Sequence, residues 1–240
     1  MSKEESENEN ESEDEDENYS LIQQSLNYGI VDQDSKYWDD VEEIGENEIL
    51  KYKISKIKIF STKNEENEVI LGVEVTYSNR LTGETKNFTN HIGTQPVFDT
   101  KEMNLKSNEY LSDFFIKCDF KNDFITELGY GTTKKNKILI GSEEGKEQNI
   151  ETNGGEYIII GIYGCYNERL DGIGFYYVKQ KDYFNKMYQS YFIIRYLTKK
   201  DSKFKQEWEK KYKELPIQYQ YIWKTVNLPD TIFSGIIKYC

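Results

Sequence analysis

Few side chains in this sequence have the types and spacings that a reaction requires. Asp39 and Asp40 are paired carboxylates, as glycosidases use, but neighbouring residues of a strand point to opposite faces and cannot flank one bond. His91 is the only histidine, and no Cys or Ser stands in a motif with it, so no nucleophilic triad or multi-histidine metal site can be assembled. We therefore expect no catalytic residues, and His91 at the surface or in a turn.

The sequence also predicts neither a metal site nor a cofactor site. Aspartates at 32, 34, 39 and 40 suggest a calcium loop, but Lys36 and Tyr37 stand where such a loop needs an oxygen ligand and a glycine. The three cysteines are widely spaced, without a CxxC pair, which argues against a zinc site or a disulfide framework. Gly129–Lys134 has glycines and a lysine but not the P-loop spacing, and predicts a strand and hairpin.

The elements that must position any site are short strands. Val69–Tyr77 alternates apolar and more polar residues, and Phe114–Phe120 repeats that period. Similar runs, separated by Gly, Asn, Asp and Thr clusters, predict further strands at Tyr52–Phe60, Lys137–Ile140, Tyr157–Tyr163 and Gly172–Val178. The apolar phase slips between Ile54 and Ile57, which predicts a β-bulge. With no alternating helices, the pattern indicates an all-β domain, and the 20 Tyr predict a core that is rich in tyrosine rather than leucine.

The two ends of the chain differ from this domain in composition and charge. Residues 1–18 carry ten acidic side chains and one Lys, so a disordered acidic leader is expected at 1–19. After a domain at 20–178, apolar residues recur at spacings of three and four, which predicts a helical extension over 179–240 with 13 basic and six acidic residues.

The formal net charge of -12 disfavours nonspecific binding to nucleic acid or to an anionic membrane. Twelve aromatic residues between Tyr183 and Trp223, interleaved with Lys, could stack on bases, but such a stripe is more often a core or a protein interface. No stretch reaches the length of a membrane span, and the acidic start is unlike a signal peptide. We therefore expect a cytoplasmic protein.

Several segments, in the same order along the chain, resemble the jacalin-related lectins. Lys36–Asp40 is similar to the aromatic-Asp-Asp signature of that family, and Ile54–Ile59 with Val69–Tyr77 is similar to its first hairpin. Asn108–Leu111 is similar to the family's Glu-Tyr-Ile segment, and Phe124–Lys134 is similar to the strand that follows it. Gly155–Gly164 followed by Leu170–Tyr176 resembles the closing strand, the sugar loop and the final strand. The resemblance covers about three-fifths of the chain and implies a β-prism of three four-stranded Greek-key sheets.

The resemblance also implies a shallow carbohydrate site. In the family, main-chain N–H groups and one Asp of a Gly-x-x-x-Asp pattern hold the sugar between the first and the last long loop. Here the pattern is Asn167-Glu168-Arg169-Leu170-Asp171, so Asp171 matches the sugar-binding Asp, with Glu168 and Arg169 as backbone donors. A carboxylate can accept hydrogen bonds from two sugar hydroxyls. In the family, galactose-specific members use a free amino terminus that is made by cleavage at the first loop. This chain is continuous there, so the resemblance favours mannose or glucose over galactose.

Two departures from the pattern leave a second hypothesis open. Ser35 and Asn167 stand where the family has glycines, and a glycine in the left-handed region is replaced more easily by Asn than by Ser. Asp171 could also be a structural turn residue. The first hypothesis is a lectin that binds a mono- or oligosaccharide; the alternative is a non-enzymatic scaffold that has lost sugar binding and docks a protein partner through residues 179–240.

The apolar stripe of the extension generates a testable expectation. Phe184, Tyr188 and Tyr191 are followed by Phe204 and Trp208, and so many large rings exposed to water would mark an interface. We expect helices that dock on the domain or on a partner, so limited proteolysis of the intact protein should spare residues 182–213. Rapid cleavage throughout this range would exclude docking on the chain's own domain, and protection gained only in cell extract would indicate a partner.

Overall fold

The computed structural model describes residues 21–29, 33–64, 67–119, 124–143, 145–150 and 156–185, with scattered positions between 199 and 210. The predicted acidic leader at 1–19 lies outside this part of the chain, and so does most of the predicted helical extension. Within the described residues, no helix has the length and apolarity that crossing a bilayer requires.

The first antiparallel sheet is a Greek key built from one long hairpin and two polar strands. It contains β4 (Tyr52–Asn64), β5 (Asn67–Asn79), β6 (Thr85–Ile92) and β7 (Asp99–Asn104), in the order β6-β5-β4-β7. The pairing register of β4 with β5 shifts between Ile54 and Lys56, which confirms the predicted bulge. Strands β6 and β7 were not predicted, because neither has the alternating apolar pattern of a half-buried strand.

The second sheet repeats this arrangement. It contains β8 (Leu111–Asp119), β9 (Phe124–Thr132), β10 (Lys137–Gly141) and β11 (Lys146–Ile150), in the order β10-β9-β8-β11. In both sheets three consecutive strands form a meander and the fourth returns beside the first, which is the Greek-key connection.

The third sheet joins the two ends of the described domain. Its centre is β12 (Tyr157–Tyr166) paired with β13 (Leu170–Lys179). Early residues flank this pair, with β3 (Lys36–Asp39) beside β12, and β1 (Gln23–Gln24) and β2 (Tyr28–Gly29) beside β13. The sheet therefore has five strands where four were expected, because its edge beside β13 consists of two short segments.

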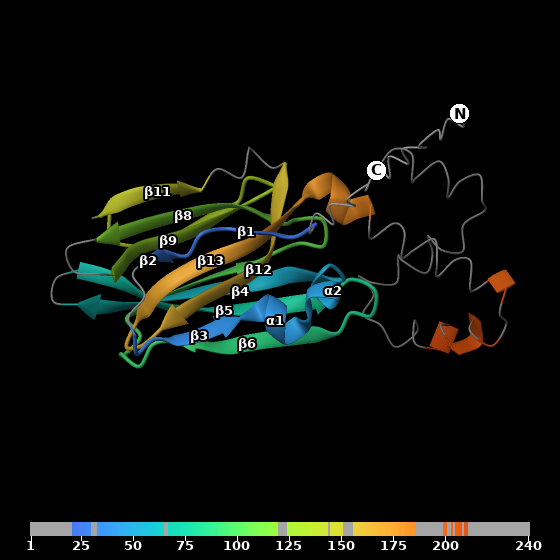
Figure 1. Cartoon of the computed structure of the whole chain (residues 1–240), viewed down its shortest axis with the longest axis horizontal. Helices are drawn as coiled ribbons and strands as arrows, with labels where there is room; N and C mark the ends of the chain where they lie inside the picture. Colours follow the sequence, from blue (N-terminus) through green and yellow to red (C-terminus); the bar gives the residue numbers. More distant parts are fainter. Residues whose placement is uncertain are drawn as a thin grey trace, which may run out of the picture.

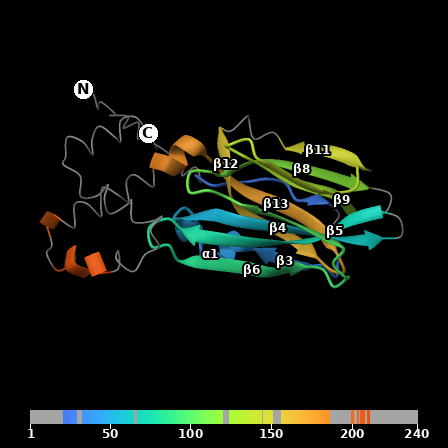
Figure 2. The ribbon, with the colours of Figure 1, turned by 180° about the vertical axis from the view of Figure 1, so that it is seen from behind.

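The three sheets pack around a common interior, as the predicted β-prism requires. Figure 1 shows β8, β9 and β11 on one side of the long β12–β13 pair and β3 and β6 on the other, and Figure 2 shows β4 and β5 from behind. Inner-face residues such as Ile57, Ile116, Leu128 and Ile162 are fully buried in one cluster. Among the described core residues tyrosines are no more numerous than leucines and isoleucines outnumber both, so the expectation of a core rich in tyrosine rather than leucine was wrong. The tyrosine count misled because many of these rings lie outside the described core.

Two short helices follow β3, where the sequence indicated strand. They are α1 (Asp40–Ile44) and α2 (Glu46–Ile49), and the Asp39 side chain caps α1 by accepting from the Val41 and Glu42 N–H groups. Asp39 and Asp40 are therefore not neighbours on one strand. Asp39 ends the strand and Asp40 begins the helix.

A buried polar network connects α1 to the first sheet. Asp40 is fully buried; its Oδ2 accepts a hydrogen bond of 2.6 Å from the Tyr77 hydroxyl, and its Oδ1 lies 2.8 Å from His91 Nε2. The His91 ring stacks on Trp38, with centroids 4.5 Å apart. The expectation that His91 lies at the surface or in a turn was wrong: it is a buried residue of β6, because a buried carboxylate needs a hydrogen-bond donor.

The chain turns into a helix at the end of β13. Residues 180–185 are helical, and Tyr183 is almost fully buried, with its hydroxyl donating a hydrogen bond of 2.7 Å to the Tyr52 carbonyl. The rings of Tyr183 and Phe184 pack edge-on against Tyr110. The first turn after β13 is thus attached to the domain near the start of β4.

The Asp40 network predicts a large stability effect from one carboxylate. Replacing Asp40 with Ala leaves His91 and Tyr77 without their buried acceptor, and should lower the free energy of unfolding in urea by roughly 1 to 3 kcal/mol for each group left unsatisfied. Tyr77→Phe leaves Oδ2 of Asp40 without its donor, which should cost roughly 1 to 3 kcal/mol.

Glu42→Ala is the matched control, because this carboxylate is on the same helix and is exposed. It should change stability by no more than about 0.5 kcal/mol. Equal stabilities of the Asp40→Ala and Glu42→Ala proteins would show that the buried network does not stabilise the fold.

Candidate functional site

The residues predicted to bind a ligand meet at one end of the third sheet. Asn167, Glu168 and Arg169 form the tight turn between β12 and β13, and Asp171 is the second residue of β13. Ser35 immediately precedes β3, the neighbour of β12. Antiparallel pairing of three strands therefore brings positions 35 and 171 together although 136 residues separate them.

A direct hydrogen bond links the two segments. The Ser35 hydroxyl donates to Oδ2 of Asp171 over 2.6 Å. Each of the two residues exposes only 8% of its surface, so the carboxylate lies just below the surface rather than projecting from it. This bond occupies one of the roughly four lone-pair positions at which a carboxylate can accept a hydrogen bond.

The serine and asparagine that replace the family's glycines fit their backbone positions without strain. Among the described residues Lys135, with φ of 63°, is the one non-glycine residue in the left-handed region, so neither Ser35 nor Asn167 adopts a conformation that favours glycine. The Asn167 N–H donates to the Arg169 carbonyl over 3.0 Å and closes the turn.

The segment after β6 supports the back of this turn, which the sequence did not indicate. The Gln95 backbone N–H donates to the Glu168 carbonyl over 3.2 Å, and the Gln95 side-chain amide lies 3.3 Å from a Glu168 carboxylate oxygen. A Cβ at Gly93 would lie 2.1 Å from the Glu168 carbonyl oxygen, so only glycine fits there. The Arg169 guanidinium lies over the Phe124 ring at 4.6 Å. Both long side chains of the turn therefore contact protein.

A second glycine approaches Asp171 from the side of β2. Gly29 has φ of 114°, and a Cβ there would lie 2.2 Å from the Asp171 carbonyl oxygen. Behind the carboxylate lies Cys165, whose thiol pKa is raised to about 11 chiefly by burial, with the Asp171 charge adding to the rise. The thiol therefore stays protonated at neutral pH and is not a nucleophile.

The chemistry that this arrangement can perform is recognition by hydrogen bonding. A carboxylate is positioned at the end of a sheet beside a tight turn, and no described group of three or more His, Cys, Asp or Glu residues is placed to hold a metal ion. All five predicted residues lie at this end, while Gly29, Gly93 and Gln95 were missed because their role depends on close approach across strands. A lone glycine in sequence does not reveal which backbone it will touch.

Comparison with known proteins places the chain in a family. A family model, Jacalin-like lectin domain, matches residues 31–176. A search of curated proteins finds no match.

Solved structures of plant lectins share the fold. Calystegia sepium agglutinin is 18% identical, with a TM-score of 0.50 and coverage of 66% of this chain and 97% of its own. Malaysian banana lectin is 21% identical, with a TM-score of 0.52 and coverage of 66% and 99%. A mannose-binding jacalin-related lectin from Ananas comosus is 15% identical, with a TM-score of 0.51 and the same coverage as banana lectin. Because the family model spans more than half of the sequence and the sheets form the matching prism, this chain belongs to the jacalin-like lectin domain family.

Proposed function

We propose that the chain is a non-enzymatic carbohydrate-binding module that holds a mannose- or glucose-type sugar at the end of the third sheet. The observation that supports this most directly is the position of Asp171, held by Ser35 at the junction of the first segment and the β12–β13 turn. The family match supports a sugar as ligand, and the Ananas comosus lectin of the same fold is described as mannose binding.

The geometry suits a neutral ligand that is rich in hydroxyl groups. Asp171 accepts hydrogen bonds, and charge-assisted bonds from two sugar hydroxyls would be stronger than bonds between neutral groups. The backbone of Glu168 and Arg169 is held by Gly93 and Gln95, so this turn needs little reordering on binding. Pre-ordering matters at a shallow site, because such a site buries little of the sugar.

One observation favours the second candidate, a scaffold without sugar binding. Asp171 is 92% covered, and the Ser35 hydroxyl already donates to it at a distance of 2.6 Å. In a scaffold this bond would simply fasten the segment before β3 to β13. The first turn of the extension, with Tyr183 packed on the domain, would then lead to the part that binds a protein partner.

Mutation of Asp171 separates the two candidates. In calorimetric titrations with methyl mannoside, glucose and galactose, we expect binding of mannose or glucose by the parent. Asp171→Asn should weaken it by roughly 2 to 5 kcal/mol, the cost of truncating one partner of a hydrogen-bonded charged contact. Ser35→Gly restores the family's residue and removes a competing donor, and should bind at least as tightly as the parent.

Asp34→Asn is the matched control, since Asp34 is an exposed carboxylate one residue from Ser35. It should leave sugar affinity unchanged. Unaltered affinity of the Asp171→Asn protein would place the sugar site elsewhere. If neither the parent nor the Ser35→Gly protein binds any of the three sugars, the scaffold is favoured.

A further inference from the structure

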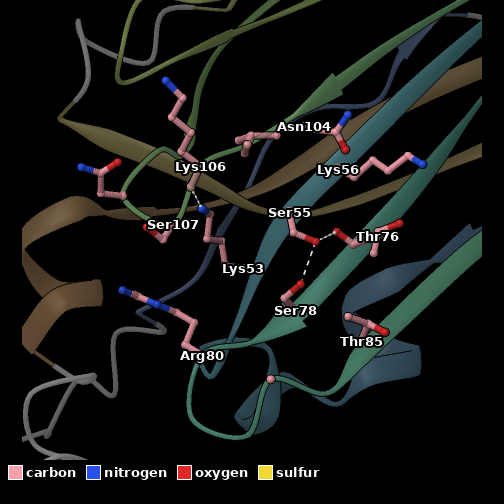
Figure 3. Close-up of a pocket in the computed structure, with 13 residues that line it drawn as sticks. Lys53, Ser55, Lys56, Thr76, Ser78, Arg80, Thr85, Asn104, Lys106 and Ser107 are labelled. Carbon is pink, nitrogen blue, oxygen red and sulfur yellow. Dashed lines mark hydrogen bonds between the residues drawn. The ribbon is translucent and has the colours of Figure 1, made fainter. Parts of the chain in front are cut away.

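A hollow of about 740 Å³, lined mainly by charged and hydroxyl-bearing residues, lies on the outer face of the first sheet, away from the Asp171 site. Its floor is made by the outward side chains of β4 and β5, including Ser55 and Ser78, and the segment after β7 and the turn after β5 form its walls (Figure 3). It lies near the Tyr52–Asn79 end of the hairpin, close to where the chain leaves β13, whereas Asp171 lies at the start of β13. Its volume is in the range of small-molecule sites.

The lining of the hollow is cationic in a strongly acidic chain. Lys53, Lys56, Arg80 and Lys106 line it, and its described lining contains no Asp or Glu. The whole chain has a formal net charge of -12, so a concave surface with four cations is not what the composition predicts. Such a surface concentrates anions, because a low-dielectric concavity focuses the potential of the charges around it.

Two of these cations are buried close together. Lys53 and Arg80 are each only 8% exposed. Burial and the neighbouring Arg80 charge lower the pKa of Lys53 to about 8, although Glu109 acts in the opposite direction. Lys53 Nζ also donates a hydrogen bond to the Lys106 carbonyl, which fixes the ammonium against the wall. Holding two cations together out of water is costly, and a bound anion would offset that cost.

Aromatic rings hold the arginine in place. The Arg80 guanidinium lies 5.3 Å from the Tyr110 ring centroid and 5.2 Å from that of Tyr183. A planar guanidinium packed on rings keeps its donors in a fixed orientation, which suits the recognition of a phosphate oxygen pair.

The nearest carboxylates are already engaged. Glu109 Oε1 accepts hydrogen bonds of 2.7 Å from Thr132 and 2.5 Å from Asn136, and Oε2 accepts one of 3.2 Å from the Lys106 N–H. Glu102 lies 3.1 Å from Lys56 Nζ, at the outer edge of the hollow. Lys56 is thus paired with Glu102, while the Lys53–Arg80–Lys106 corner gathers three cations near Glu109, whose charge acts on Lys53 and Lys106.

The floor beside this corner is made of hydroxyl groups. Ser78 donates to Ser55 over 2.8 Å, and Ser55 donates to the Thr76 carbonyl over 3.1 Å, as Figure 3 shows. In this chain of hydrogen bonds Ser78 uses its hydroxyl hydrogen, and the lone pairs of a hydroxyl oxygen can accept a hydrogen bond from an alcohol. A ligand with hydroxyl groups next to its charge would match both parts of the surface.

We propose that this hollow binds a small phosphate monoester that carries hydroxyl groups, such as a hexose phosphate. The phosphate, with a charge near -2 at neutral pH, lies at the Lys53–Arg80–Lys106 corner, and the hydroxyl-bearing part lies over Ser55 and Ser78. This site is independent of the proposed sugar site at Asp171.

The test is to titrate the full-length, isotope-labelled protein with glucose 6-phosphate, inorganic phosphate and glucose, and to follow backbone amide shifts by NMR. We expect glucose 6-phosphate to shift amides at 53–56, 76–80 and 104–108, inorganic phosphate to shift part of this set with weaker affinity, and glucose to leave it unchanged. Arg80→Gln and Lys106→Gln should each weaken glucose 6-phosphate binding about tenfold, the loss of one charge-assisted contact.

Lys58→Gln is the matched control, because Lys58 is on the same face of β4, contacts Glu74 and does not line the hollow. It should retain full affinity, and so should Asp171→Asn, which separates this site from the sugar site. If Arg80→Gln does not fold, Ser78→Asp, which adds a carboxylate to the floor, should also abolish binding. Absence of shifts at millimolar glucose 6-phosphate, or an equal loss of affinity in Lys58→Gln, would overturn the proposal.

Discussion

The pairing of the two chain regions at either end of the domain is the constraint on which the rest of the structure depends. β12 and β13 form a hairpin late in the sequence, and β1, β2 and β3 from its beginning complete the same sheet. The third face of the prism exists only when residues more than a hundred positions apart pair. The candidate site depends on the same closure, because Ser35 comes from the early segment and Asp171 from the late one.

The hydrogen bond between Ser35 and Asp171 has opposite meanings for the two functions considered. In a lectin it orients the acceptor carboxylate before the ligand arrives, at the cost of one acceptor position. In a scaffold it is a structural bond that fastens the sheet edge. The surrounding contacts fit both, since Gly29 and Gly93 hold the backbone on either side of the carboxylate by close approach. The difference lies in whether a sugar hydroxyl competes with the serine.

The two candidate sites differ in charge as well as position. Beside the turn between β12 and β13 the Asp171 carboxylate lies just below the surface, and neutral hydroxyl groups would complement it. On the outer face of the first sheet, buried Lys53 and Arg80 face a hollow lined without carboxylates. A phosphate would be repelled by the carboxylate of the first site and attracted by the cations of the second, so the two proposals call for ligands of different charge. Their separation follows from the fold, which places loops at both ends of each hairpin.

The sequence by itself determined the strands that are rich in β-branched and aromatic side chains. Val69–Tyr77 and the segment that became β8 were found because burial on one face imposes a period of two. The segments that became β10, β12 and β13 were found as short runs of β-branched and aromatic residues between turn signals. The bulge after Ile54 was visible as a slip in that period, and ordered family-like segments indicated the prism and the location of Asp171.

Only the tertiary structure decided the features that arise from contact between distant segments. The polar strands β6, β7 and β11 pair through their backbones, which leaves no side-chain period to read. His91 and Asp40 are both polar, and only their mutual contact makes their burial favourable. Ser35 likewise became a partner of Asp171, and Lys53 a neighbour of Arg80, because strand pairing brought them together. A linear pattern records what each residue prefers, while the free energy of burying a polar or charged group depends on the partner that the fold supplies.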